Sequence, residues 1–166
     1  KKNIDKIKML RNYGSLNKVD YKCIGINSRL DSLQAKFLST KLNYLDKWND
    51  QRNKISQLYL DGLKDIKNIA LPEISDNKKS VWHLFVIRCK DGRRNELLNF
   101  MKENNVMCSI HYPKPIHKTS AYKNSKIRLK KSEKFSEQII SLPMDPFLKK
   151  NEVMKVISLI KKFFAY

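Results

Sequence analysis

The sequence predicts an α/β fold in which a long helix precedes a small domain of strands and helices. Three observations support this fold class. Apolar residues recur at spacings of three and four over 30–63, a near-continuous apolar run occupies 81–87, and a second helical stripe ends the chain. With 166 residues, 41% hydrophobic and 31% charged, the chain is long and apolar enough to bury a core.

The first 63 residues predict two helices separated by a polar loop. Residues 1–12 have their apolar side chains roughly on one helical side, and Gly14 is the expected left-handed residue that ends this helix. After a loop that closes with Asn27 or Ser28 as the N-cap, one continuous helix is expected over 30–63. Because this helix exceeds the usual globular length, we expect it to bridge two bodies.

The remainder of the chain predicts a small domain in which strands and helices alternate. Strands are expected at three apolar runs, namely 81–87, 106–110 and 139–142. Helices are expected over 93–104, in short pieces within 116–137, and from Asn151 onward. The first strand is so uniformly apolar that it is expected to be covered on both faces, with His83 buried and hydrogen-bonded within it.

The formal net charge of +19 raises nucleic acid as a partner. The 28 lysines and 7 arginines are spread along the whole chain, however, and no nucleic-acid-binding motif accompanies them. One local concentration occurs at 114–134, where eight basic residues accompany Glu133 alone. We therefore expect no nucleic-acid partner. We interpret the basic run either as a solvated face or as a patch that faces a diphosphate.

Cysteine usage and hydropathy predict a cytoplasmic protein. Cys23, Cys89 and Cys108 are odd in number and widely spaced, which is typical of free thiols in a reducing compartment. No apolar run reaches the length of a membrane span, so no membrane contact is expected. The chain opens with a helical pattern instead of a signal peptide, and this abrupt start predicts a piece of a longer protein.

A glycine-led polar loop precedes the long helix. Gly25 allows close backbone approach, Asn27 and Ser28 offer side-chain donors, and Arg29 offers a fork for phosphate or carboxylate. A helix N-terminus is also a natural site for an anion. The same residues suit a simple helix cap with a surface arginine, and composition alone does not choose between these interpretations.

A second polar cluster occupies the proline-stiffened loop from His111 to His117. His111, Tyr112 and His117 suit a site for a polar ligand or a phosphate, but they also suit a hydrogen-bonded structural turn. Zinc would need a third ligand, and neither Asp nor Glu lies at ligand spacing, so no metal is expected. Motifs of known catalytic machinery are absent from the sequence, and no catalytic residue is predicted in this chain.

The ordered set of these segments resembles the DegT/StrS family of pyridoxal-phosphate-dependent sugar aminotransferases. The matching stretches run nearly end to end and in family order: MLRNYGS (9–15), GINSRLDSLQA (25–35), KLNYLDKWNDQR (41–52), VWHLF (81–85), HYPKPIH (111–117), AY (121–122) and SLPM (141–144). Each stretch is common by itself, whereas the ordered set is highly specific.

The resemblance implies the fold of type I pyridoxal-phosphate-dependent transferases, with the large domain mostly absent. Residues 1–29 would be the tail of the large domain, 30–68 the long inter-domain helix and its connection, and 69–166 the small C-terminal α/β domain. The family works as a homodimer with shared active sites. It moves an amino group from glutamate to a keto sugar carried on a nucleotide diphosphate, for polysaccharide or glycan biosynthesis, with pyridoxal 5′-phosphate as cofactor.

The resemblance also implies roles for individual residues. Asn27 would reach the cofactor phosphate of the partner subunit, with Arg29 close by. His111, Tyr112 and His117 would line the side of the nucleotide sugar.

The Schiff-base lysine of the family lies upstream of the residues that match this chain. The 166 residues alone are therefore expected to be inactive. Two alternatives stay open from the sequence. One is a sugar dehydratase of the same family, which lacks that lysine, and the other is a non-enzymatic basic module that binds nucleic acid.

Overall fold

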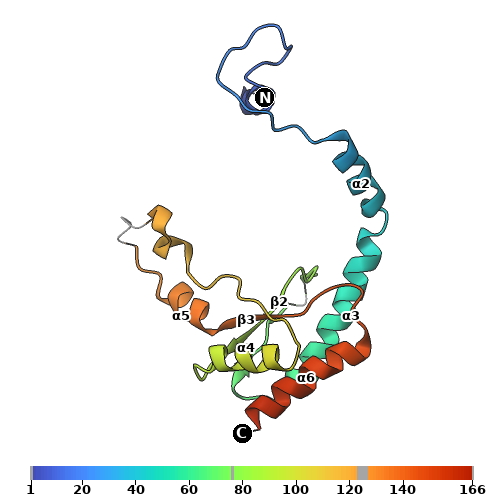
Figure 1. Cartoon of the computed structure of the whole chain (residues 1–166), viewed down its shortest axis with the longest axis vertical. Helices are drawn as coiled ribbons and strands as arrows, with labels where there is room; N and C mark the ends of the chain where they lie inside the picture. Colours follow the sequence, from blue (N-terminus) through green and yellow to red (C-terminus); the bar gives the residue numbers. More distant parts are fainter. Residues whose placement is uncertain (1, 76, 123–126, 166) are drawn as a thin grey trace. The chain divides into compact units, whose positions relative to one another are not determined.

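A computed structural model describes residues 2–75, 77–122 and 127–165, and the chain forms two compact units, Lys1–Leu45 and Asp46–Tyr166 (Figure 1). The first unit contains α1 (Lys2–Leu10) and α2 (Ser32–Leu42). The second begins within α3 (Leu45–Leu63) and continues, in chain order, with β1 (Ile69–Ala70), β2 (Phe85–Cys89), α4 (Arg94–Glu103), η1 (Ile116–Lys118), η2 (Ser120–Tyr122), α5 (Lys130–Gln138), β3 (Ile139–Leu142) and α6 (Lys150–Phe164).

A hydrogen-bonded loop joins the two helices of the first unit. Its two arms pair through an antiparallel bridge between Asn12 and Asn27. The amide of Tyr13 donates to the carbonyl of Ile26 at 3.1 Å on one side of this bridge. Gly14 has a φ of +94°, which confirms the left-handed residue predicted after the first helix. The loop is therefore held by its backbone.

The continuous helix predicted over 30–63 is wrong, because the chain forms α2 and α3 as separate helices. The break lies at Asn43 and Tyr44, where the amide of Tyr44 bonds the carbonyl of Lys41 in a tighter turn. Asparagine competes with the helical backbone for hydrogen bonds and so favours helix ends. The regular apolar spacing across the break concealed this end.

The predicted N-cap of this helix is also wrong. Asp31 caps α2, because its Oδ1 accepts the amide of Leu33 at 2.8 Å. Asn27 and Ser28 are bonded elsewhere, since the side chain of Asn27 accepts from Arg29 and the amide of Ser28 donates to the carbonyl of Arg11. The two residues proposed as caps are therefore part of the loop.

The second unit is built on an antiparallel sheet of order β1-β2-β3, in place of the strand–helix–strand arrangement that the sequence suggested. β3 confirms the strand predicted at 139–142.

The strand predicted at 81–87 starts later, at Phe85, because Trp82 has a φ of 48° and its amide bonds the hydroxyl of Ser80. That turn leaves His83 exposed, so its predicted burial is wrong. The strand predicted at 106–110 is reduced to a bridge between Ser109 and Ser141.

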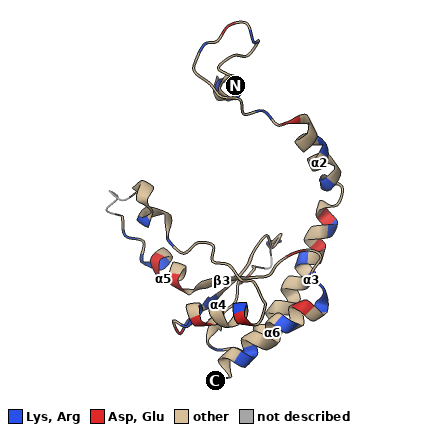
Figure 2. Ribbon diagram, in the orientation of Figure 1, with Lys and Arg blue, Asp and Glu red and all other residues tan. Residues whose placement is uncertain are grey.

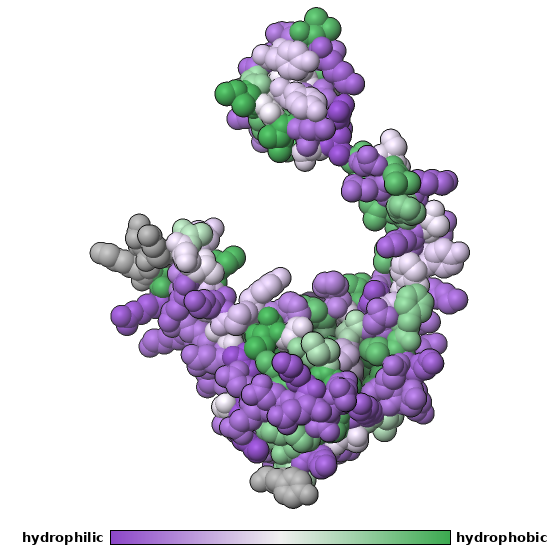
Figure 3. All heavy atoms as spheres, viewed as in Figure 1, coloured by the Kyte–Doolittle hydropathy of each residue, from purple (hydrophilic) through white to green (hydrophobic). Residues whose placement is uncertain are grey.

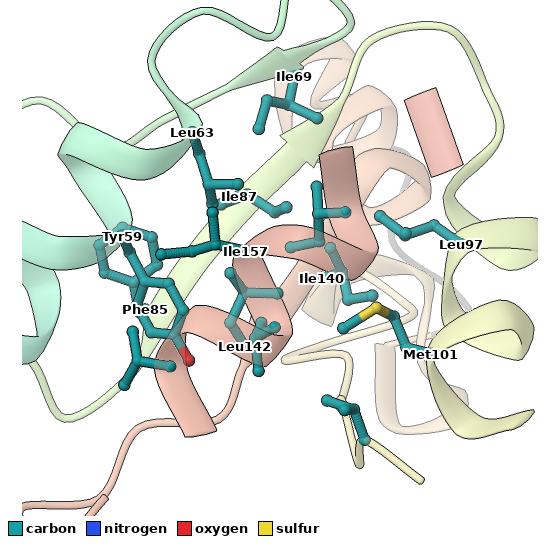
Figure 4. Close-up of a cluster of buried hydrophobic side chains, with 14 of the residues drawn as sticks. Tyr59, Leu63, Ile69, Phe85, Ile87, Leu97, Met101, Ile140, Leu142 and Ile157 are labelled. Carbon is teal, nitrogen blue, oxygen red and sulfur yellow. The ribbon is translucent and has the colours of Figure 1, made fainter. Parts of the chain in front are cut away.

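The core of the second unit lies between one face of the sheet and the helices α3, α4 and α6. Along β2, Phe85, Ile87 and Cys89 are buried, and the residues between them are only partly buried. Figure 4 shows side chains from all three strands and all three helices converging in this core: Tyr59, Leu63, Ile69, Phe85, Ile87, Leu97, Met101, Ile140, Leu142 and Ile157. Within the core, the hydroxyl of Tyr59 donates to the carbonyl of Pro143 at 2.9 Å.

The opposite face of the sheet meets α5. The guanidinium of Arg88 lies 4.2 Å from the ring centroid of Phe135, and it donates to Gln138 at 3.4 Å. From α4, the buried Arg94 donates to the carbonyls of Ser136 and Ile139 at the C-terminal end of α5. A guanidinium is favourable at a helix C-terminus, where carbonyls lack helical partners. Two arginines therefore hold α5 against the sheet.

The last helix agrees with its predicted stripe but not with its predicted cap. Val153, Val156, Ile157 and Ile160 are buried, as expected. The N-cap is Lys149 instead of Asn151, and the Oε2 atom of Glu152 accepts the Lys149 amide at 2.7 Å.

Many apolar side chains of the first unit lie at its surface. All residues of α2 are described, and none of them is buried. Leu33, for example, is 64% exposed and Leu42 is 67% exposed. Figure 3 shows hydrophobic atoms at the surface of the unit that contains the N-terminus. Among the described residues, no helix combines the length and apolarity needed to cross a membrane.

Candidate functional site

Asn27 and Arg29 lie together at the end of the loop in the first unit. The Nε atom of Arg29 donates to Oδ1 of Asn27 at 3.1 Å. Because Oδ1 of Asn27 accepts this bond and Nε of Arg29 donates it, Nδ2 of Asn27 and the outer nitrogens of Arg29 remain as donors for a ligand. Arg29 also lies 5.7 Å from the centroid of the Tyr13 ring. The pair therefore presents a fork of N–H groups suited to an anion.

A basic hollow of about 330 Å³ adjoins this pair. Its lining contains the cations Lys8, Arg11, Lys18 and Arg29, together with polar Asn12 and Ser15, and no carboxylate among the described residues. Such a donor set fits a phosphate group, including the phosphate of pyridoxal phosphate. Sequence reasoning missed Lys8, Arg11 and Lys18 as site residues, although Arg11 lies within one of the stretches that carry the family resemblance.

The second predicted cluster is split by the fold. Tyr112 and His117 both line an open, mainly apolar hollow of about 970 Å³ between the proline-rich loop and α5. His111 is not among the described lining residues, and its Nδ1 lies 2.9 Å from the hydroxyl of Ser141 on β3. The structure therefore brings two of the three predicted residues to one hollow and ties the third to the sheet edge. Their roles in substrate binding stay predictions.

Glu133 contacts one of the predicted site residues, His117, and sequence reasoning missed it. Its Oε1 atom lies 2.9 Å from Nε2 of the buried His117 and accepts the amide of Leu129 at 3.2 Å. Its Oε2 atom lies 2.8 Å from Nζ of Lys118. One carboxylate therefore joins η1 to the first turn of α5. The available signal was that Glu133 is the sole acidic residue within the basic run at 114–134.

Acid should open this Glu133 cluster. Hydrogen bonds from Lys118 and then His117 lower the pKa of Glu133 from its usual 4.5 to about 2. Because the folded pKa is depressed, the stabilisation is fully present above pH 4.5 and is lost as the pH falls towards 2. We expect the Leu129 amide resonance to report this titration by NMR. A Glu133→Gln variant should lack the transition, and its persistence in that variant would contradict the assignment.

Other reactive groups are inert or dispersed. Burial raises the pKa of Cys89 to about 12 and that of Cys108 to about 11, so both thiols stay protonated at neutral pH. Within the described residues, no group of three or more His, Cys, Asp or Glu could hold a metal. Figure 2 shows acidic residues interspersed with basic ones along α3 and α5.

Comparison with known proteins finds relatives that match nearly the whole chain. The DegT/DnrJ/EryC1/StrS aminotransferase family matches residues 1–161. A dTDP-3-amino-3,6-dideoxy-alpha-D-galactopyranose transaminase of Aneurinibacillus thermoaerophilus is 39% identical over 96% of this chain and 43% of its own. A dTDP-3-amino-3,4,6-trideoxy-alpha-D-glucose transaminase of Streptomyces venezuelae is 36% identical over 96% of this chain and 42% of its own.

Solved structures agree with the sequence comparison. DesV of S. venezuelae, solved in complex with a ketimine intermediate, superposes with a TM-score of 0.90 and 35% identity. The alignment covers 98% of this chain and 44% of that one. The chain thus spans less than half the length of the relatives it matches. With the family match over residues 1–161, these findings place the chain in the DegT/DnrJ/EryC1/StrS aminotransferase family.

Proposed function

We propose that this chain is the C-terminal part of a pyridoxal-phosphate-dependent aminotransferase. The complete enzyme would move an amino group from glutamate to a keto sugar carried on a nucleotide diphosphate, for polysaccharide or glycan biosynthesis. The observation that carries this proposal is the match along 96% of the chain to two dTDP-sugar transaminases. In this proposal, residues 1–29 belong to the large domain, 30–68 form the connection, and 69–166 form the small domain.

The chemistry of the first unit supports a role in holding the cofactor phosphate. The Nδ2 donor of Asn27 and the outer nitrogens of Arg29 would bind phosphate oxygens, and the basic hollow beside them would balance the charge. When bound, pyridoxal phosphate supplies the electron sink for amino-group transfer. The protein groups in this chain would orient the cofactor and the substrate, whereas the lysine expected to carry the cofactor lies in the part of the relatives that this chain does not match.

The second unit would contribute to the substrate side. Tyr112 and His117 line a hollow large enough for part of a nucleotide sugar. Once the ligand is bound, the mainly apolar surroundings would shield its hydrogen bonds from water. His111 would support this loop from the sheet edge through Ser141.

The exposed apolar side chains of α2 support a homodimer with shared sites. Several exposed apolar side chains on one helix usually pack against other protein. In the complete enzyme, we propose that this helix is covered by the large domain and by the partner subunit. A cytoplasmic location follows from the same proposal.

The two alternatives have weaker support. A dehydratase of the same family would bind the same cofactor, but the relatives named above are transaminases. A nucleic-acid-binding module would account for the net charge but not for the match over residues 1–161.

An Asn27→Ala variant tests the proposal directly. The enzyme would be completed by joining the N-terminal part of the A. thermoaerophilus relative to residue 1 of this chain. The parent is expected to bind pyridoxal phosphate with a visible absorbance band that borohydride removes, because a lysine carries the cofactor. Asn27→Ala should weaken cofactor affinity by about tenfold or more, through loss of one hydrogen bond to a charged group.

A matched control comes from the neighbouring residue. Ser28→Ala keeps the backbone bond to Arg11, and its hydroxyl bonds no other group among the described residues, so cofactor affinity should not change. Unchanged affinity in Asn27→Ala would reject the role of Asn27. A folded parent that binds no cofactor would reject the proposed function, and binding without a borohydride-sensitive band would favour the dehydratase.

A further inference from the structure

The Glu133 cluster joins two segments that both contribute residues to the lining of the large hollow. One segment contains His117 and Lys118, and the other contains Leu129 and the first turn of α5. The Glu133 carboxylate receives bonds from both segments, so it holds them together. Its side chain is only 27% exposed, and that of His117 is 6% exposed.

The ionised carboxylate determines which nitrogen of His117 carries a proton. The pKa of Glu133, about 2, keeps it ionised at neutral pH, and an ionised carboxylate can only accept hydrogen bonds. Nε2 of His117 must therefore donate to Oε1 across their 2.9 Å separation. In the neutral imidazole the other nitrogen, Nδ1, is then an acceptor.

Nδ1 is the part of the ring left for a ligand. No described residue bonds it, and His117 is one of the residues that line the large hollow. A neutral acceptor nitrogen attracts a hydroxyl group. It disfavours an ionised phosphate oxygen, because the ring nitrogen and that oxygen would then face each other with lone pairs.

We propose that Glu133 is a positioning residue that holds His117 as a hydrogen-bond acceptor for a hydroxyl group of the ligand. The proposal rests on the proposed function and deepens it, since it assigns a sugar or nucleoside hydroxyl, and not the diphosphate, to His117. Lys118 engages the other carboxylate oxygen, Oε2, so it does not compete with Nε2 of His117 and the Leu129 amide for Oε1.

The tautomer can be observed without any activity. In the ¹⁵N-labelled 166-residue chain at pH 7.5, two-bond hydrogen–nitrogen correlations should show His117 with its proton on Nε2. Glu133→Ala should move both ring nitrogens towards the averaged values of a solvated imidazole. Glu137→Ala, which removes an exposed glutamate one turn later on α5, should leave them unchanged. Lys118→Met removes the contact with Oε2 of Glu133 but keeps the bond between His117 and Glu133, so it should also leave them unchanged.

A proton on Nδ1 in the parent chain, or the same tautomer in the parent and in Glu133→Ala, would overturn the proposal. The Lys118→Met variant guards against an uninformative result. If Glu133→Ala disorders the loop, an unchanged tautomer in Lys118→Met still supports Glu133 as the determinant, and a lost tautomer counts against it.

Ligand binding to the completed enzyme tests the hydroxyl assignment. Glu133→Ala should weaken binding of dTDP-glucose by about tenfold, the effect of one well-oriented hydrogen bond, and should leave binding of inorganic pyrophosphate unchanged. Equal weakening of both probes would mean a purely structural role and would overturn the proposal. A parent that shows the expected tautomer but binds no nucleotide sugar would reject the proposed function and the hydroxyl assignment, while the tautomer result would stand on its own.

Discussion

Replacing Gly25 with alanine is expected to disorder the loop that carries Asn27 and Arg29. A Cβ atom at position 25 would lie 2.2 Å from the backbone nitrogen of Gly14 and 2.7 Å from the carbonyl oxygen of Leu10. Both contacts are with backbone, which cannot rotate away as a side chain can, so the two arms of the loop must separate. We expect a cost of at least about 3 kcal/mol for the folded loop.

Amide hydrogen exchange measures this effect locally. The amides of Tyr13 and Ser28 bond across the two arms in the parent. Their protection should fall by about a hundredfold or more in Gly25→Ala, because each ~1.4 kcal/mol of lost opening free energy lowers protection about tenfold. Gly92→Ala is the control. Gly92 has a φ of +82°, but no described atom lies within 4 Å of an added Cβ, so about 1 kcal/mol should be lost there and none in the loop. Retained protection in Gly25→Ala would show that the arms tolerate a side chain.

Replacing Phe85 with alanine is expected to be the most damaging core substitution in the second unit. Phe85 is 0% exposed, its ring centroid lies 5.0 Å from that of Tyr59 and 5.2 Å from that of Trp82, and its backbone pairs with Leu142. Truncation would leave a cavity where α3 meets the sheet. We expect a loss of about 3–5 kcal/mol in the free energy of unfolding.

Urea unfolding followed by circular dichroism checks this value. The transition midpoint should fall while its slope stays constant, because the mutation changes stability and not the surface exposed on unfolding. Phe147→Ala is a size-matched control. Phe147 is 67% exposed and meets Trp48 edge-on at 6.1 Å, so less than about 1 kcal/mol should be lost. Similar losses in the two variants would mean that Phe85 is not a central core residue.

The candidate site was predictable where neighbours in sequence are also neighbours in space. Asn27 and Arg29 are two residues apart and bond each other, so the local stretch already contained the donor pair. Lys8, Lys18 and Arg29 reach one hollow only because the loop folds back on itself through the Asn12–Asn27 bridge. Single lysines among 28 carry no signal in the sequence that would select them.

The helical stripes, the strand at 139–142, the left-handed Gly14 and the family resemblance all followed from the residues alone. Each depends on local periodicity, on backbone freedom at one position, or on the order of short stretches. The start of β2, the burial of His117 and the partners of Glu133 depend instead on groups distant in the chain. Which strand pairs with which, and which carboxylate meets which imidazole, is decided by the free energy of packing the whole unit. Local patterns do not encode that free energy, so only the tertiary structure could determine these features.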